Sequence, residues 1–236
     1  MIEKEGVATV VIGLIRPQIE NTKPPRAVWV PFELGRPFGP PSDPAFQRQV
    51  IRTALTMLVE NGGPVRIVDF PQDDPRGKPD SGWRPPIAAA PAGLAAPALA
   101  QAFETEIERL APAYERSVAR RRRSTVGLLG QPIAEAARYV AQWLAGEAPP
   151  SPIADMSPPL ALRFAIDDVK AYALEAGLAE PAHPSSRQLG DWLWNETAIG
   201  QAFFALRQAN LNATDERLKL IAGNFIVPSV RATAAG

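Results

Sequence analysis

The sequence predicts an α/β unit with a small, mainly parallel three-stranded sheet and a crossover helix, followed by an all-α region. Three observations support this prediction. Apolar and β-branched residues concentrate in three short runs, all of them before residue 71. A clearly marked helix separates the second run from the third. The residues after position 91 show helical spacing but no further strand pattern.

The first unit is expected over residues 1–70. Its strands are expected at residues 7–15, 27–32 and 65–70, with a turn at residues 23–25 between the first two. The helix before the third strand has Ser42 and Asp43 as capping candidates and Pro44 at its first position, where a missing N–H has no cost. Asn61-Gly62-Gly63-Pro64 predicts its end. Because a helix links them, the second and third strands should be parallel.

The remainder of the chain divides into a linker and a helical region. Residues 71–91 are rich in Pro and Gly and predict a surface loop or linker, and residues 92–236 predict helices. The helices are expected at about residues 94–122, 132–145, 160–176, 186–208 and 214–223. Pro112 predicts a break or kink in the first of them, and the Pro-rich residues 146–159 predict a second connector.

Composition excludes several classes of function. The 25 basic and 25 acidic side chains give no net charge, so no global field attracts nucleic acid or an anionic membrane. The amino terminus carries acids and one short apolar run, which predicts neither a signal peptide nor a membrane span. One histidine, no cysteine and no carboxylate cluster at ligand spacing predict no metal site and no cofactor. We therefore expect a cytoplasmic protein.

The loop after the second strand is the first candidate site. Arg16, Glu33 and Arg36 supply a cation, an anion and a cation near Gly35 and Gly39. An arginine can hold a carboxylate through two hydrogen bonds and a glutamate can pair with an ammonium, so the loop suits a small zwitterionic or amine ligand. Alternatively, the glycines serve a tight turn, and Glu33 pairs with Arg36 to shape the loop.

A family resemblance rests on the order of the expected elements. A strand and a turn are followed by a second strand that ends in Leu34-Gly-Arg-Pro-Phe-Gly39, and then by a helix rich in Arg, Gln and Leu. Residues 5–61 resemble the carboxyl-terminal segment of the substrate-binding B component of glycine/sarcosine/betaine (D-proline) reductase complexes, and that component's small relatives. The resemblance implies a substrate-binding role. In that family the reductive chemistry depends on a cysteine or selenocysteine upstream of the matching segment, and this chain has no cysteine.

The helical region holds two further candidate sites. Trp192, Asn195 and Glu196 lie at helical spacing and could form an aromatic wall for a cationic group. Alternatively, Trp192 belongs to a hydrophobic core. His183 is, with Glu33, a weak candidate for acid/base catalysis, and its alternative role is that of a packed or solvent-facing loop residue.

The residues Arg120 to Arg123 form the one concentrated run of charge. Four arginines can contact phosphates or an acidic surface. Alternatively, they interact with the dipole at the carboxyl end of their own helix. No aromatic residues alternate with them, so nucleic-acid binding is not expected.

These observations favour a cysteine-free, substrate-binding subunit of a glycine/betaine-reductase-like oxidoreductase assembly. A first alternative is a non-catalytic interaction or scaffolding protein derived from that family, and a second is a stand-alone acid/base enzyme that uses Glu, Arg and His. If the chain takes part in reduction, a partner chain bearing cysteine or selenocysteine must supply the redox centre. One crossover helix cannot cover both faces of a parallel sheet, so we expect a homo-oligomer or such a partner chain.

Overall fold

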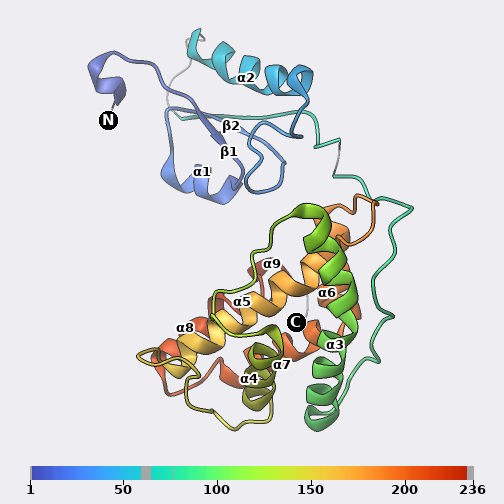
Figure 1. Ribbon diagram of the computed structural model, residues 1–236. Helices are drawn as coiled ribbons and strands as arrows, with labels where there is room; N and C mark the ends of the chain where they lie inside the picture. The colour runs from blue at the N-terminus through green and yellow to red at the C-terminus, as the bar shows by residue number, and fades with distance from the viewer. Residues whose placement is uncertain (1, 60–64, 76, 233–236) are drawn as a thin grey trace. The chain divides into compact units, whose positions relative to one another are not determined.

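The computed structural model describes residues 2–59, 65–75 and 77–232 (Figure 1). The chain divides into two compact units, Met1–Pro79 and Asp80–Gly236, called here the first and second unit. The first combines a small sheet with helices, and the second is helical. The predicted fold class, α/β followed by all-α, is therefore confirmed.

The sheet of the first unit has three parallel strands in the order β1-β2-β3. They are β1 (Val11–Gly13), β2 (Arg26–Trp29) and β3 (Arg66–Asp69), each shorter than the apolar run that predicted it. In register, Gly13 lies opposite Trp29, and Trp29 lies opposite Asp69. The three strands therefore end together, and their carboxyl ends form one edge of the sheet.

Two helices connect these strands where the sequence predicted one. The missed helix is α1 (Arg16–Thr22), where we expected only a turn at residues 23–25. Pro17 lies in its first turn, and Lys23 ends it in the left-handed conformation (φ 47°), with its N–H bonded to Ile19 O at 3.0 Å. A one-turn 3-10 helix, η1 (Ile2–Glu5), precedes β1.

The longer crossover is α2 (Pro44–Val59), and its start is the predicted one. The carboxylate of Asp43 accepts a hydrogen bond from Phe46 N at 3.0 Å, so Asp43 caps the helix. The stop predicted at residues 61–64 lies outside the described residues. Phe32, Phe46 and Phe70 pack with ring centroids 5.5 to 5.8 Å apart and form the centre of the core between α2 and the sheet.

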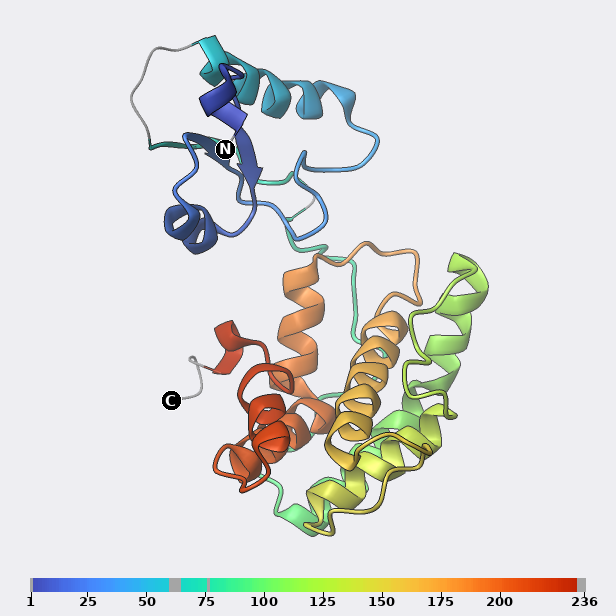
Figure 2. The same ribbon diagram turned by 90° about the vertical axis from the view of Figure 1, so that its left-hand side faces the viewer.

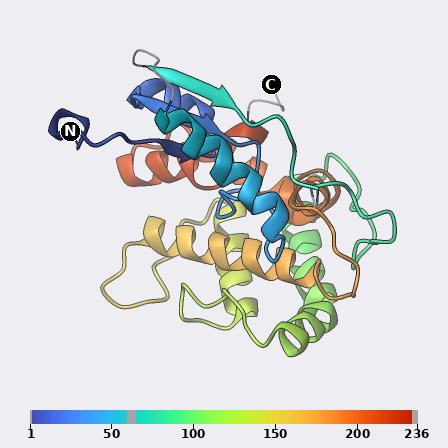
Figure 3. The same cartoon turned by 90° about the horizontal axis from the view of Figure 1, so that it is seen from above.

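The helices α1 and α2 cover opposite faces of the sheet (Figures 1 and 2). Val28 faces the core under α2, whereas Gly13, on the other face, contacts Ile19 of α1. Viewed from above, α2 runs beside β3 (Figure 3). Because the strand order is sequential and the helices lie on opposite faces, the two crossovers have opposite hands, and only one follows the usual right-handed rule.

The second unit contains the remaining helices. They are α3 (Ala96–Arg121), α4 (Ile133–Leu144), α5 (Pro158–Ala176), α6 (Ser186–Glu196), α7 (Ala198–Asn210), α8 (Glu216–Asn224) and α9 (Ser229–Ala232). The helix α3 continues through Pro112 instead of breaking there. Pro112 and Glu108, four residues earlier, are both exposed, so water can bond the carbonyl that the proline leaves free.

The single helix expected at residues 186–208 is two helices, α6 and α7. They meet at Thr197, whose extended backbone (φ −112°, ψ 152°) ends α6 and whose side chain accepts a hydrogen bond from Gly200 N to start α7. A Cβ on Gly200 would lie 2.3 Å from Leu193 O. Only glycine therefore permits this close approach.

Irregular chain connects β3 to α3, and its second half packs against the second unit. Trp83 is buried, and its indole Nε1 donates to Gly177 O at 2.9 Å. Ala90 N donates to Glu196 O at 2.7 Å. These contacts explain why the second unit begins at Asp80, inside the segment that composition alone predicts to be a linker. Within the described residues, no helix is both long and apolar enough to cross a membrane.

Candidate functional site

Polar and aromatic side chains meet at the carboxyl edge of the sheet. Arg16 begins α1 just after β1, Trp29 ends β2 and Asp69 ends β3. The guanidinium of Arg16 donates through Nη1 to Asp69 Oδ1 and through Nε to Glu20 Oε1, the latter at 2.8 Å. Its central carbon lies 5.3 Å from the centroid of the Trp29 ring. We call Arg16, Glu20, Trp29 and Asp69 the edge cluster.

The local fold positions Arg16 through a close contact behind it. A Cβ on Gly13 would lie 2.5 Å from Ile19 Cδ1, so the missing side chain allows α1 to fold back against β1. Trp29 is oriented by a hydrogen bond from its Nε1 to Leu14 O at 3.3 Å. The glycine and the short helix together bring Arg16 over the end of β2.

The edge cluster joins one cation to two carboxylates, and it is open to solvent. Hydrogen bonding with Asp69 first, and with Glu20 second, raises the pKa of Arg16 above its ordinary value. The side chains of Arg16, Glu20 and Asp69 are 40%, 52% and 51% exposed, so these ion pairs add little to fold stability. They can instead exchange partners with a ligand that carries both charges.

The predicted loop site follows β2 at the same edge. Arg36 Nη1 lies 3.5 Å from Glu33 Oε2, so the two charged candidates pair with each other. The loop consists of two successive turns closed by Arg36 N to Glu33 O and Gly39 N to Arg36 O, at 3.0 and 2.9 Å. Gly35 and Gly39 have φ values of 89° and 85°, which side chains other than glycine rarely adopt. The structure thus contains the ion pair and the tight turns of the alternative interpretation.

The three candidates on α6 do not share a surface. Trp192 is 1% exposed and packs edge-on against Trp83 at 6.2 Å, inside the core of the second unit. Asn195 and Glu196 are exposed. Trp192 therefore lies in the core, as the alternative interpretation had it, and it is not open to a cationic ligand.

His183 is an exposed loop residue, and its structural contact is made by its backbone. Its N–H donates to Asp80 Oδ2 at 2.8 Å, and this bond, followed by one from Gly82 N, lowers the pKa of Asp80. A capping box of Ser185 and Gln188 starts α6. Among the described residues, no hydrogen bond or ion pair holds the imidazole ring. Such a bond would be needed to orient the ring as a general base.

The arginine run is partly engaged within the second unit. Arg120 donates to the carbonyls of Leu178 and Glu180, just beyond the end of α5, and Arg116 pairs with Glu180 at 3.0 Å. Arg122 ends α3 in the left-handed conformation. These contacts give Arg120 a structural role, but its partners follow α5 and do not belong to its own helix. Among the described residues, no group of three or more His, Asp or Glu side chains could hold a metal ion.

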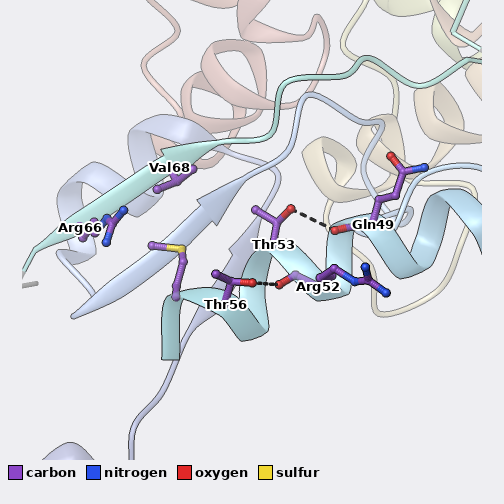
Figure 4. A pocket seen from close by; sticks show the side chains of 7 residues that line it. Gln49, Arg52, Thr53, Thr56, Arg66 and Val68 are labelled. Carbon is purple, nitrogen blue, oxygen red and sulfur yellow. Dashed lines mark hydrogen bonds between the residues drawn. The ribbon is translucent and has the colours of Figure 1, made fainter. Parts of the chain in front are cut away.

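Asp69, Trp29 and Glu20 were not predicted as partners of Arg16. Asp69 could have been found, because it ends the third strand run and the carboxyl ends of parallel strands meet at one edge. A second missed feature is a groove between α2 and β3 (Figure 4). It is lined by Gln49, Arg52, Thr53, Thr56, Met57, Arg66 and Val68.

Comparison with known proteins gives a partial match. The chain is 31% identical over 72 residues to the D-proline reductase subunit gamma of Acetoanaerobium sticklandii. The match covers 30% of this chain and 30% of that protein, so the chain aligns with under a third of its relative's length. No family model and no solved structure matches. The chain thus partly resembles a reductase subunit, which agrees with the family resemblance found in the sequence.

Proposed function

We propose that the chain is a substrate-binding subunit of a reductase-type assembly and that its edge cluster holds a small zwitterionic amino acid. The observation that carries this proposal is the position of Arg16 over the Trp29 ring, with Asp69 and Glu20 as its partners. A cation, two carboxylates and an aromatic surface occupy one solvent-open edge. The name of the relative suggests the ligand to try first, D-proline.

Each part of such a ligand has a complement in the edge cluster. The ligand carboxylate would pair with the guanidinium of Arg16. The ligand ammonium would pair with Asp69 or Glu20, each of which now shares the charge of Arg16. The apolar ring of proline would lie against Trp29. Binding therefore exchanges internal ion pairs for ligand ion pairs, at an edge where α/β sheets commonly bind ligands.

The redox centre in this proposal belongs to another chain. Reductive cleavage in this chemistry uses a thiolate or selenolate as nucleophile, and the 236 residues contain no cysteine. The relative is named as a subunit. A partner with a reactive sulfur or selenium would approach the ligand while this chain orients it.

The ion pairs themselves favour a second candidate, a non-catalytic interaction protein. Arg16 already pairs with Asp69, and Arg36 already pairs with Glu33. Such internal ion pairs can fix the conformation of this sheet edge without any ligand being bound. The two candidates differ in a measurable property, which is the binding of a free amino acid.

Isothermal titration of the purified chain with D-proline, L-proline and glycine distinguishes the two candidates. We expect saturable binding of D-proline and at least a tenfold loss of affinity in Arg16→Gln and in Asp69→Asn. Arg48→Gln is the matched control, because Arg48 is exposed on α2 and lies outside the edge cluster. Absence of D-proline binding, or equal binding by Arg16→Gln, would favour the interaction protein.

A further inference from the structure

The outer side of β3 is an open sheet edge. β3 is the last strand in the order β1-β2-β3, and no described residue pairs with it on its outer side. Arg66 N donates to Pro25 O and Phe70 N to Trp29 O, at 3.1 and 2.8 Å, so alternate backbone groups of β3 face β2. The backbone N–H and C=O groups of Ile67 and Asp69 therefore point outward, where a further strand would bind.

A groove of about 400 Å³ lies beside this edge, between β3 and α2 (Figure 4). Val68 and the buried Met57 give it an apolar floor. Thr53 and Thr56 form one wall, and their hydroxyls donate back to the carbonyls of Gln49 and Arg52 at 3.0 and 2.8 Å. The groove can therefore take the side chains of an extended segment that pairs with β3.

The α2 side of the groove is positively charged. Arg52 lines the groove from α2. The helix α2 also carries Arg48 but no Asp or Glu anywhere in Pro44–Val59. An occupant that carries acidic side chains would complement this surface.

We propose that an extended, acidic segment of a partner chain adds to the outer edge of β3 and lies along α2. Its backbone bonds the outward groups of Ile67 and Asp69, and every second side chain points into the groove toward Arg52. A second copy of this chain fits less well, because its β3 carries one arginine and one aspartate and so offers no net negative charge to Arg52. This inference does not rest on ligand binding at the edge cluster.

The test uses two synthetic octapeptides with alternating residues, one of valine and glutamate and one of valine and lysine. Both are titrated into the ¹⁵N-labelled full chain and followed by NMR. We expect the glutamate peptide to shift the amide signals of Ile67 and Asp69 and to slow their hydrogen exchange. The lysine peptide should bind at least tenfold more weakly.

A substitution that reverses one charge on α2 provides the test variant. Arg52→Glu should lower the affinity for the glutamate peptide at least tenfold and raise the affinity for the lysine peptide. Arg187→Glu, the same change at an exposed position of the second unit, should leave both affinities unchanged. If Arg52→Glu fails to fold, Arg52→Gln should still lower the affinity for the glutamate peptide.

Three results would overturn the inference. The first is no saturable binding of the glutamate peptide, and the second is equal binding of both peptides. The third is protection of the Ile67 and Asp69 amides that grows with protein concentration in the absence of peptide, which would identify a second copy as the occupant. None of these results affects the titration with D-proline, so the two proposals can fail separately.

Discussion

The carboxylate of Asp168, on α5, accepts a hydrogen bond from the backbone N–H of Leu129 at 2.9 Å, inside the second unit. Its other oxygen accepts from Gly127 N and Leu128 N at 2.7 and 2.8 Å. Asp168 has no exposed surface. One buried carboxylate therefore satisfies three consecutive backbone donors of the loop that follows α3.

Replacing this carboxylate should be costly. In Asp168→Asn one acceptor oxygen becomes a donor facing backbone N–H groups, so we expect a loss of about 3 kcal/mol in the free energy of unfolding. Urea denaturation measures it. Asp155→Asn, at an exposed position, is the control. A loss below about 1 kcal/mol would mean that water or another group replaces the carboxylate.

Glu106 should make stability depend on pH. Its carboxylate accepts from Ile199 N at 3.0 Å at the start of α7, and burial raises its pKa above the ordinary value of 4.5. The folded state thus binds the proton more tightly than the unfolded state. The contribution of Glu106 to stability is largest below pH 4.5 and falls as pH rises through its folded pKa.

The variant Glu106→Gln isolates this effect, because its amide oxygen can still accept from Ile199. The stability of the wild-type chain relative to Glu106→Gln should be greater at pH 4.5 than at pH 7, as measured by denaturation at both values. A relative stability that rises with pH would show that the hydrogen bonds outweigh the cost of burying the charge.

The contact between Gly13 and Ile19 should control the edge cluster. In Gly13→Ala the new Cβ collides with the Ile19 side chain, so we expect a loss of about 1 to 3 kcal/mol in stability and a displaced Arg16. Ile19→Val removes the atom nearest to the new Cβ, so the double variant should regain part of the lost stability. Denaturation of the four proteins gives the coupling energy, and simple additivity would contradict the contact.

The pair of Glu33 and Arg36 tests the loop after β2. If the pair only shapes the loop, Arg36→Ala and Glu33→Gln should each cost less than about 1 kcal/mol, because the pair is partly exposed. Both should leave D-proline affinity within about twofold of wild type. A loss of about 1.5 to 3 kcal/mol in binding by Arg36→Ala, without a change in melting temperature, would instead place Arg36 on the ligand.

Exposed apolar residues predict association. Ile51, Leu55 and Val59 recur every fourth residue on α2 and are 40%, 56% and 80% exposed. We expect light scattering at micromolar concentration to show a dimer, or the chain to need a co-expressed partner for solubility. Leu55→Lys should then raise the monomer fraction. A soluble wild-type monomer with no tendency to associate would contradict this expectation.

The elements that the sequence predicted well are those whose signals are local. Asp43 and Pro44 mark the start of α2 within two residues, and the β-branched runs mark the strands. The helix α1 was missed because it is short and ends at Lys23, where glycine would be the usual signal. The break at Thr197 was missed because threonine also occurs inside helices, and its capping role depends on Gly200.

The candidate site was only partly predictable for a related reason. Arg16 was named only as a polar group of the loop after the second strand. Its partner Asp69 lies 53 residues away, and only the register of β1, β2 and β3 brings them together. Trp192 was ambiguous because core packing and an aromatic binding wall require the same residue type at the same spacing.

The burial of Trp83 determines where the chain can be cut. A fragment starting at residue 92, as composition alone would suggest, loses the indole that packs on Trp192 and bonds Gly177. It would expose a hole in its interior and should aggregate. A fragment starting at Asp80 keeps this indole, and limited proteolysis of the intact chain should therefore cleave before Asp80 and spare residues 80–91.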